Sequence, residues 1–442
     1  MKLCGRGAVV NSRAYRRYVL FVMTVVFALN YMDRCLINLL VQPIKVDLKL
    51  SDTEVGFLTG IVFGLFYATL GIPIARWADR GNRAKLTAGA IGIWGATVMS
   101  CLLVRTFGQI IFARVAAGVG EAGCMPPTYS LIGDYFPAPS ERTRAMSIYW
   151  LGGPVSALIA FSMGGWLSDM YGWRVTFFLF GVPGLLIAVL VWATVVDPRA
   201  TVVAAGAAAR KGQFIGLVRN LWRHRASRDL NISVVLLFTM GLGLNPWYAA
   251  FLIRSHAMSM TDVGIVLGLT FGVGGIGGVL LSARLAGRKF AGNDQKQLRW
   301  CSLVAGSMGP IFIIFLFAPN KYLAVSSIIP YMFAFYYLLG PIFSLMQRLV
   351  PDDVRATSMS VVMLLANLIG MGVGPQIVGV VSDVFRPLFG ADSLRIGMLL
   401  MSFTSLWASF HLWRAGSTIR EGLDELEMEM AKPQTHCESL RV

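Results

Sequence analysis

The stretch LSDTEVGFLTGIVFG, residues 50–64, has a second copy in the other half of the chain, MSMTDVGIVLGLTFG at residues 258–272. Seven positions are identical, all at an offset of 208. Shorter matches follow in the same order: Arg142, Met146 and Ser147 with Arg355, Met359 and Ser360, and Gly165, Ser168 and Asp169 with Gly379, Ser382 and Asp383. Similarity that recurs at a nearly constant period indicates an internal repeat. The chain is therefore predicted to consist of two similar halves.

Both copies lie in apolar runs, and such runs dominate the composition. Hydrophobic residues make up 56% of the 442 residues, and only 14% are charged, against about 25% in soluble domains. A soluble core cannot hide this surplus, so a soluble enzyme, a disulfide scaffold and a disordered chain are excluded. Runs of about 20 apolar residues, enough to cross a bilayer core of about 30 Å as a helix, recur twelve times. They lie at about 18–41, 53–75, 85–105, 108–132, 143–167, 173–196, 230–253, 262–285, 299–319, 321–347, 357–382 and 393–414.

The repeat and the runs predict an all-α integral membrane protein with two pseudo-symmetric bundles of six helices. Its expected parts are a tail 1–17, a bundle 18–196, a basic linker 197–229, a bundle 230–415 and an acidic tail 416–442. With the N-terminus inside, most of the 39 Lys and Arg residues fall on the cytoplasmic side. The positive-inside rule therefore predicts a multi-pass protein of the inner membrane with both termini in the cytoplasm.

The net charge of +16 would also suit a nucleic-acid-binding protein. The basic residues, however, lie in short loops between apolar runs, which is typical of loops held at an anionic inner leaflet. We therefore expect membrane lipids and no nucleic acid as partners. Six scattered cysteines without a CxxC, and four dispersed histidines, predict neither a metal site nor another cofactor. GxxxxGK[ST] and HExxH motifs are absent from the sequence, so an enzyme is not expected.

Four charged residues fall at membrane depth: Asp33 and Arg34 in the first span, and Arg114 and Glu121 in the fourth. A charge at this depth is costly unless it is paired or hydrated, which makes it a functional candidate. If the two spans touch, two acids and two bases meet with zero net charge. One acid can then exchange a proton while the arginines hold the other acid or a substrate anion. The alternative is a static ion pair that locks the bundle.

Glu121 lies seven residues after Arg114, on the same face of a helix two turns away. Because Glu121 is one of only two deep acids, its protonation is expected to release Arg114 and permit a conformational switch.

Two further sets of residues are candidates for gating and for lining a cavity. The loop ARWADRGNRAK, residues 75–85, places Asp79 where it can contact a neighbouring helix end, although an ordinary positive-inside loop explains it equally well. Polar and aromatic side chains at depth line a cavity or serve as helix–helix contacts. The cavity candidates are Asn30, Tyr31, Asn245, Trp247, Tyr337 and Asn367.

These features together resemble the major facilitator superfamily. RVAAGVGEA at 114–122 is similar to its fourth-span signature, and DRGNR at 79–83 is similar to its loop motif. The loop departs from the pattern at Ala75, Asn82 and Ala84, where the family has glycine, glycine and a basic residue. The combination of ALNYMDR, GVGEAG, DYFP and GWR resembles the spinster branch in a bacterial form. Anion:cation symporters of the superfamily also carry the four deep charges.

The resemblance implies alternating access driven by an ion gradient, usually of protons, by a functional monomer. It implies that Asp33, Arg34, Arg114 and Glu121 form the coupling and binding centre. It also implies that Asp79, Arg80 and Arg142 belong to a cytoplasmic gate. Spinster relatives move lysophospholipids or sphingosine-1-phosphate.

The expected function is proton-coupled transport of a small amphipathic organic anion or lysolipid-like molecule. All four deep charges lie in the first half, and spans 7–12 carry no charged side chain at midplane depth. This asymmetry suits a molecule with one charged head and an apolar body, because a sugar needs hydrogen-bond partners around its whole outline. A carboxylate or sugar-acid:proton symporter is the first alternative, and a non-transporting receptor or scramblase is the second.

Overall fold

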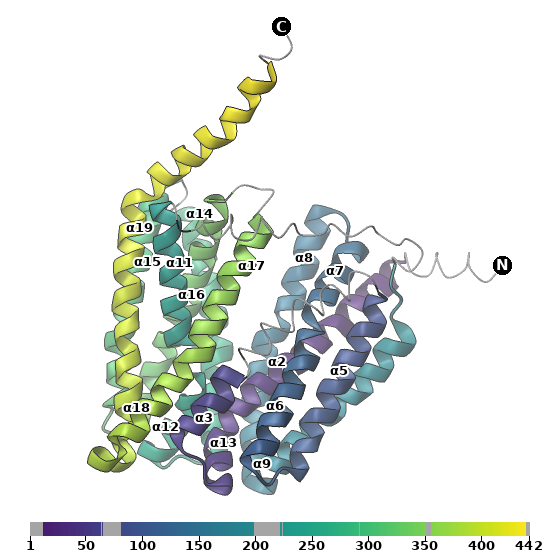
Figure 1. Cartoon of the computed structure of the whole chain (residues 1–442), viewed down its shortest axis with the longest axis vertical. Helices are drawn as coiled ribbons and strands as arrows, with labels where there is room; N and C mark the ends of the chain where they lie inside the picture. Colours follow the sequence, from purple (N-terminus) through teal and green to yellow (C-terminus); the bar gives the residue numbers. More distant parts are fainter. Residues whose placement is uncertain are drawn as a thin grey trace, which may run out of the picture. The chain divides into compact units, whose positions relative to one another are not determined.

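The computed structural model describes residues 12–62, 64, 81–198, 222, 224–290, 292–350 and 355–438. Every regular element in these ranges is a helix (Figure 1). Eight helical segments of the described chain are long and apolar enough to cross a membrane. Two of them, Arg144–Thr194 and Val361–Glu425, each contain two of the predicted spans. The remaining two predicted spans are the second, which lies partly outside the described residues, and the fourth, which is interrupted at Gly123.

Contacts between residues divide the chain into two compact units. The first contains residues 1–207 and 246–272, and the second contains residues 208–245 and 273–442. Each half predicted from the sequence is one continuous stretch of chain, whereas each of these units combines two separate segments. Residues 246–272 group with the first unit because their helix α13 (Met260–Leu269) packs along α9 (Gly152–Thr194).

Helices of the first unit supply spans one to six. In chain order they are α2 (Arg13–Leu48), α3 (Asp52–Gly56), η1 (Phe57–Ile61), α5 (Arg83–Ser100), η2 (Cys101–Leu103), α6 (Phe107–Ala122), α7 (Met125–Tyr135), α8 (Pro139–Trp150) and α9, followed later by α12 (Asn245–His256), α13 and the start of η3 (Thr270–Gly274). Ser51 caps α3 in a full capping box with Glu54. Ser259 caps α13 at the equivalent repeat position, where it accepts a hydrogen bond from the Asp262 N–H.

A turn at Gly172 separates the fifth and sixth spans within α9. Gly172 has φ of 80° and ψ of 164°, a conformation open to glycine because it lacks a Cβ. The next residues anchor the turn: Arg174 stacks on Trp173 at 4.3 Å and reaches the Asp47 carboxylate at 2.6 Å. The hydrogen bond from Arg174 lowers the pKa of Asp47 below its usual value.

Helices of the second unit complete the fold. They are α11 (Arg225–Gly241), α14 (Gly275–Arg288), α15 (Asp294–Leu316), α16 (Lys321–Arg348), α17 (Arg355–Leu365), η4 (Ala366–Val373), α18 (Gly374–Phe389), η5 (Gly390–Asp392) and α19 (Ser393–Glu438). α19 packs on α11 and α15. The buried Asp229 of α11 joins α19 through His411, whose Nδ1 lies 2.8 Å from Oδ1. The predicted acidic tail continues α19 as a helix, and its Glu425 contacts His224 at the end of the predicted linker at 2.9 Å.

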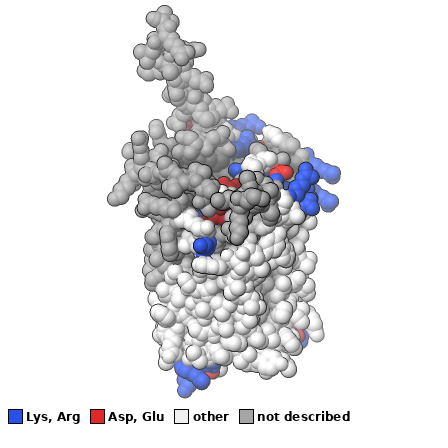
Figure 2. All heavy atoms as spheres, turned by 90° about the vertical axis from the view of Figure 1, so that its right-hand side faces the viewer, with Lys and Arg blue, Asp and Glu red and all other residues white. Residues whose placement is uncertain are grey.

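Charged side chains gather at the two ends of the face drawn in Figure 2, with an uncharged band between them. Large apolar side chains are exposed along the helices, as in Phe112, which is 74% exposed, and Leu186, which is 66% exposed. Surface of this kind is stable against lipid tails, which accounts for the apolar surplus in the composition.

Candidate functional site

The four deep charges meet inside the first unit as two ion pairs. Arg114 Nη1 of α6 lies 2.5 Å from Asp33 Oδ2 of α2, and Arg34 Nε of α2 lies 2.8 Å from Glu121 Oε2 of α6. Asp33 and Glu121 are buried, with 2% and 0% of their surfaces exposed. The Arg34 side chain keeps 18% of its surface exposed. The first and fourth spans therefore touch, and each contributes one acid and one base.

The pairing differs from the expected release of Arg114 by Glu121. The ion pair of Glu121 is with Arg34, and the ion pair of Arg114 is with Asp33. Seven helical residues span about 10 Å along the axis, so Arg114 and Glu121 lie at different levels of α6. Adjacent residues on α2 point in different directions, which lets Asp33 and Arg34 each reach a different level of α6.

Each carboxylate of the quartet binds its arginine through one oxygen only. The other oxygens, Asp33 Oδ1 and Glu121 Oε1, are buried and accept no hydrogen bond from any residue that the structure describes.

Close helix packing holds α6 in this position. A Cβ at Gly120 would lie 2.8 Å from the Ala90 carbonyl oxygen and from the Trp94 backbone nitrogen of α5. Only glycine permits this approach, which fixes the level of the neighbouring Glu121.

The other predicted site residues are spread over both units. In the first unit, Asn30 and Trp247 are buried and Tyr31 is half-buried. In the second unit, Tyr337 is 3% exposed, and Asn245 and Asn367 are half-buried. Asn367 donates to the Met363 carbonyl one turn earlier, at 2.8 Å. Asn30 and Tyr31 precede Asp33 on the same helix, α2, whereas Trp247 lies on α12.

The predicted cytoplasmic gate is described only in part, since Asp79 and Arg80 lie outside the described residues. Arg142 donates to the Gly133 carbonyl at 3.2 Å and faces the end of α7. A neighbouring buried arginine was not predicted. Arg83 Nε and its backbone N–H donate to Asp197 Oδ2 at 3.0 and 2.8 Å, and Arg83 Nη2 lies 2.8 Å from Asp134.

A second unpredicted cluster lies at the opposite ends of the helices. Asp52 is 1% exposed and accepts hydrogen bonds from Arg254 Nη1 and Nη2, at 3.0 and 2.8 Å. It also forms an ion pair with Lys45. Arg254 Nε donates to Gln42 at 2.7 Å. In the sequence Asp52 stands between Ser51 and Glu54, which is the pattern of a helix start, and its ion-pair partners lie seven and 202 residues away. This outer cluster joins the ends of α2, α3 and α12.

Removing the central carboxylate should destabilise the outer cluster. We expect Asp52→Asn to lower the free energy of unfolding by about 3 kcal/mol. The reason is that Lys45 and Arg254 then face each other without a counter-charge. The measurement is thermal unfolding of the purified protein, followed by tryptophan fluorescence. Asp262→Asn is the control, since Asp262 lies in the first turn of the equivalent repeat helix but is exposed. Equal melting temperatures for the two variants would show that the cluster contributes no stability.

Close to the outer cluster, α9 and α13 form a seam of small residues. A Cβ at Gly165 would lie 3.2 Å from Gly264 Cα, and one at Gly264 would meet the Phe161 carbonyl. Gly268 faces Ser162 one turn further along α13. Thr261 donates to Asp169 Oδ2 at 2.6 Å and ties the helix ends together. The glycines found by the internal repeat therefore serve backbone-to-backbone packing.

The arrangement of spans has a known counterpart. A family model described as Major Facilitator Superfamily matches residues 23–375. The chain belongs to this superfamily. Its twelve-span, two-bundle fold is thereby confirmed, as is the predicted spinster-like kinship within the superfamily.

The chain is similar to the following three proteins. An MFS-type efflux pump of Mycolicibacterium smegmatis is 32% identical over 407 residues, 91% of this chain and 93% of that protein. A crystal structure of a bacterial homologue of the human lysosomal transporter spinster, inward-facing and unoccupied, is 28% identical with a TM-score of 0.81, covering 93% of this chain and 99% of that one. The probable galactarate/D-glucarate transporter GudP of Bacillus subtilis is 24% identical over 61% of this chain and 64% of that protein.

Proposed function

We propose that this superfamily member is a proton-coupled secondary transporter that works by alternating access. The paired quartet carries the proposal. Two acids and two bases at membrane depth are poor stabilisers compared with apolar packing, so a functional reason for keeping them is favoured. We place the protein in the inner membrane with both termini in the cytoplasm, on the strength of its loop charges. We propose that it acts as a monomer, as the resemblance to the superfamily implies.

The quartet suggests how proton binding changes the structure. A proton at Glu121 neutralises the partner of Arg34, which is the more exposed of the two arginines. Arg34 then becomes available to a substrate anion, while Arg114 stays with Asp33. Binding of the proton and binding of the substrate anion are thereby coupled through the Arg34 guanidinium. The quartet with both bound carries no net charge.

The opposite ends of the helices supply the conformational part of the proposal. The outer cluster and the α9–α13 seam close the side that the loop charges place outside the cell. Opening that side requires the seam and the Asp52–Arg254 pair to separate. Asp79, Arg80 and Arg142 are proposed to act in the same way at the cytoplasmic side.

For the substrate we propose an amphipathic organic anion of lysolipid type. The head would bind near Arg34, and the tail would lie on apolar surface, where burial contributes roughly 25 cal/mol per Å². The lysolipid class is what the resemblance to the spinster branch implies, and a bacterial spinster homologue is among the similar structures.

A chain-length series tests the substrate class. Proteoliposomes are loaded with lysophosphatidylglycerols of increasing acyl length, with and without a pH gradient. We expect the affinity of the protein for the lysolipid to rise by about a factor of three to four per added CH₂. Each buried CH₂ contributes about 0.8 kcal/mol to the free energy of binding. Flat affinity along the series would contradict the proposal. Together with tight binding of D-glucarate it would favour the second candidate, a sugar-acid symporter, which the similarity to GudP supports.

A further inference from the structure

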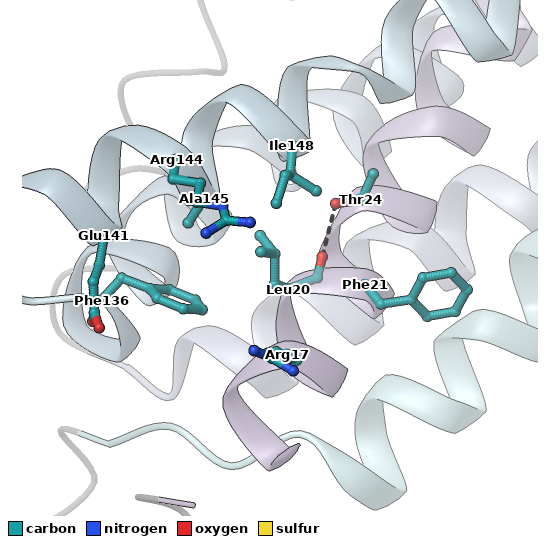
Figure 3. A pocket seen from close by; sticks show the side chains of 9 residues that line it. All are labelled: Arg17, Leu20, Phe21, Thr24, Phe136, Glu141, Arg144, Ala145 and Ile148. Atoms are coloured by element: carbon teal, nitrogen blue, oxygen red, sulfur yellow. Dashed lines mark hydrogen bonds between the residues drawn. The ribbon is translucent and has the colours of Figure 1, made fainter. Parts of the chain in front are cut away.

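A pocket of about 380 Å³ opens between α2 and the α7–α8 region, entirely within the first unit (Figure 3). It is separate from the quartet. Its lining consists of Arg17, Leu20, Phe21, Thr24, Phe136, Glu141, Arg144, Ala145 and Ile148. Figure 3 shows the guanidinium groups of Arg17 and Arg144 on different sides of Leu20. The pocket thus combines two cations with an apolar floor.

The charges in this pocket do not cancel. Its one acid, Glu141, pairs with Arg16 at 2.5 Å, and Arg16 is held over the Phe136 ring at 4.7 Å. Arg17 and Arg144 form no ion pair or hydrogen bond with any other part of the chain that the structure describes. Two like charges at one pocket repel each other unless an anion lies between them. The pocket is therefore complementary to a negatively charged group.

The surroundings of the two arginines are apolar and exposed. Phe21 is 66% exposed and Ile148 is 40% exposed, one turn beyond Arg17 and Arg144 on their respective helices. Leu20 and Ala145 are buried at the floor. The first predicted span begins at about residue 18 and the fifth at about residue 143. The arginines therefore lie at the level of lipid headgroups, with apolar side chains directed along the acyl region.

We propose that this pocket binds the headgroup of an anionic phospholipid from the cytoplasmic leaflet. The phosphate would accept hydrogen bonds from Arg17 and Arg144, since guanidinium groups bind phosphate oxygens in a bidentate manner. The acyl chains would cover Phe21 and Ile148. The bound lipid would hold the starts of the first and fifth spans together by neutralising their repulsion. The site is distinct from the proposed transport centre.

Lipid binding to the full-length protein tests the site directly. Phosphatidylglycerol and phosphatidylcholine of the same acyl chains compete for the protein in nanodiscs of mixed composition. We expect a preference of about tenfold or more for phosphatidylglycerol, because each arginine near the surface contributes to anionic lipid binding. In the double variant Arg17→Gln, Arg144→Gln the preference should fall to near one.

Two comparisons separate this site from general charge effects and from soluble anions. The variant Arg13→Gln, Arg420→Gln removes two exposed arginines outside the pocket and should keep the preference. Glycerol 1-phosphate should compete far more weakly than phosphatidylglycerol, because it lacks the acyl chains. An unchanged preference in the pocket variant, an equal loss in the control variant, or equal competition by glycerol 1-phosphate would each overturn the proposal. Transport activity is not measured in this experiment, so the lipid-binding result can be interpreted even if the transport proposal is wrong.

Discussion

Glu121→Gln is expected to abolish proton-driven accumulation while substrate binding is retained. Glutamine keeps the size of the side chain and a carbonyl oxygen for the Arg34 Nε–H, but it cannot gain or lose a proton. A pH difference of one unit supports about tenfold accumulation per coupled proton. The accumulation ratio in proteoliposomes should therefore fall from about ten to about one, while thermal shifts produced by substrate stay the same.

The comparison variants for this experiment come from the same chain. Glu425→Gln alters an exposed glutamate that contacts His224, far from the quartet in sequence, and should accumulate substrate like the wild type. Asp33→Asn tests the other acid, whose loss removes the carboxylate that lies 2.5 Å from the buried Arg114. If Glu121→Gln accumulates substrate at the wild-type ratio, Glu121 does not carry the proton.

Gly264→Val is expected to open the seam between α9 and α13. Its side chain would overlap the Phe161 carbonyl and approach Gly165 Cα, and neither backbone atom can move aside alone. Overpacking of this kind costs about 1–3 kcal/mol. If only the closed state contains the contact, the population should shift toward the open state by about tenfold to hundredfold.

A cysteine reporter measures this shift. Met258 lies between α12 and α13 and is only 8% exposed, so a Met258→Cys thiol is covered while the seam is closed. A membrane-impermeant maleimide added outside should label it faster in Gly264→Val. Gly89→Val is the matched control, because a Cβ at Gly89 meets no atom within 4 Å. Equal labelling rates in Gly264→Val and the control, with both proteins folded, would show that the seam is not a gate.

Much of the fold follows from local sequence patterns. Each span is a long apolar run, and a helix in lipid satisfies its own backbone hydrogen bonds, so length and composition suffice to predict it. The Ser51–Glu54 capping box and the turn at Gly172 are likewise local. The four deep charges stood out because such residues are rare at membrane depth.

Partners that are distant in the sequence were decided only by tertiary structure. The sequence placed Glu121 with Arg114 on one helix face, but in the folded unit the Arg34 side chain of α2 reaches Glu121 on α6 and pairs with it. Asp52 looked like part of a helix start, and it became the centre of a buried cluster once α12 brought Arg254 to it. Periodicity determines which residues share a face of one helix, whereas the level and rotation of neighbouring helices depend on packing over the whole unit. Ion pairs form over only about 4 Å, so they depend on that packing.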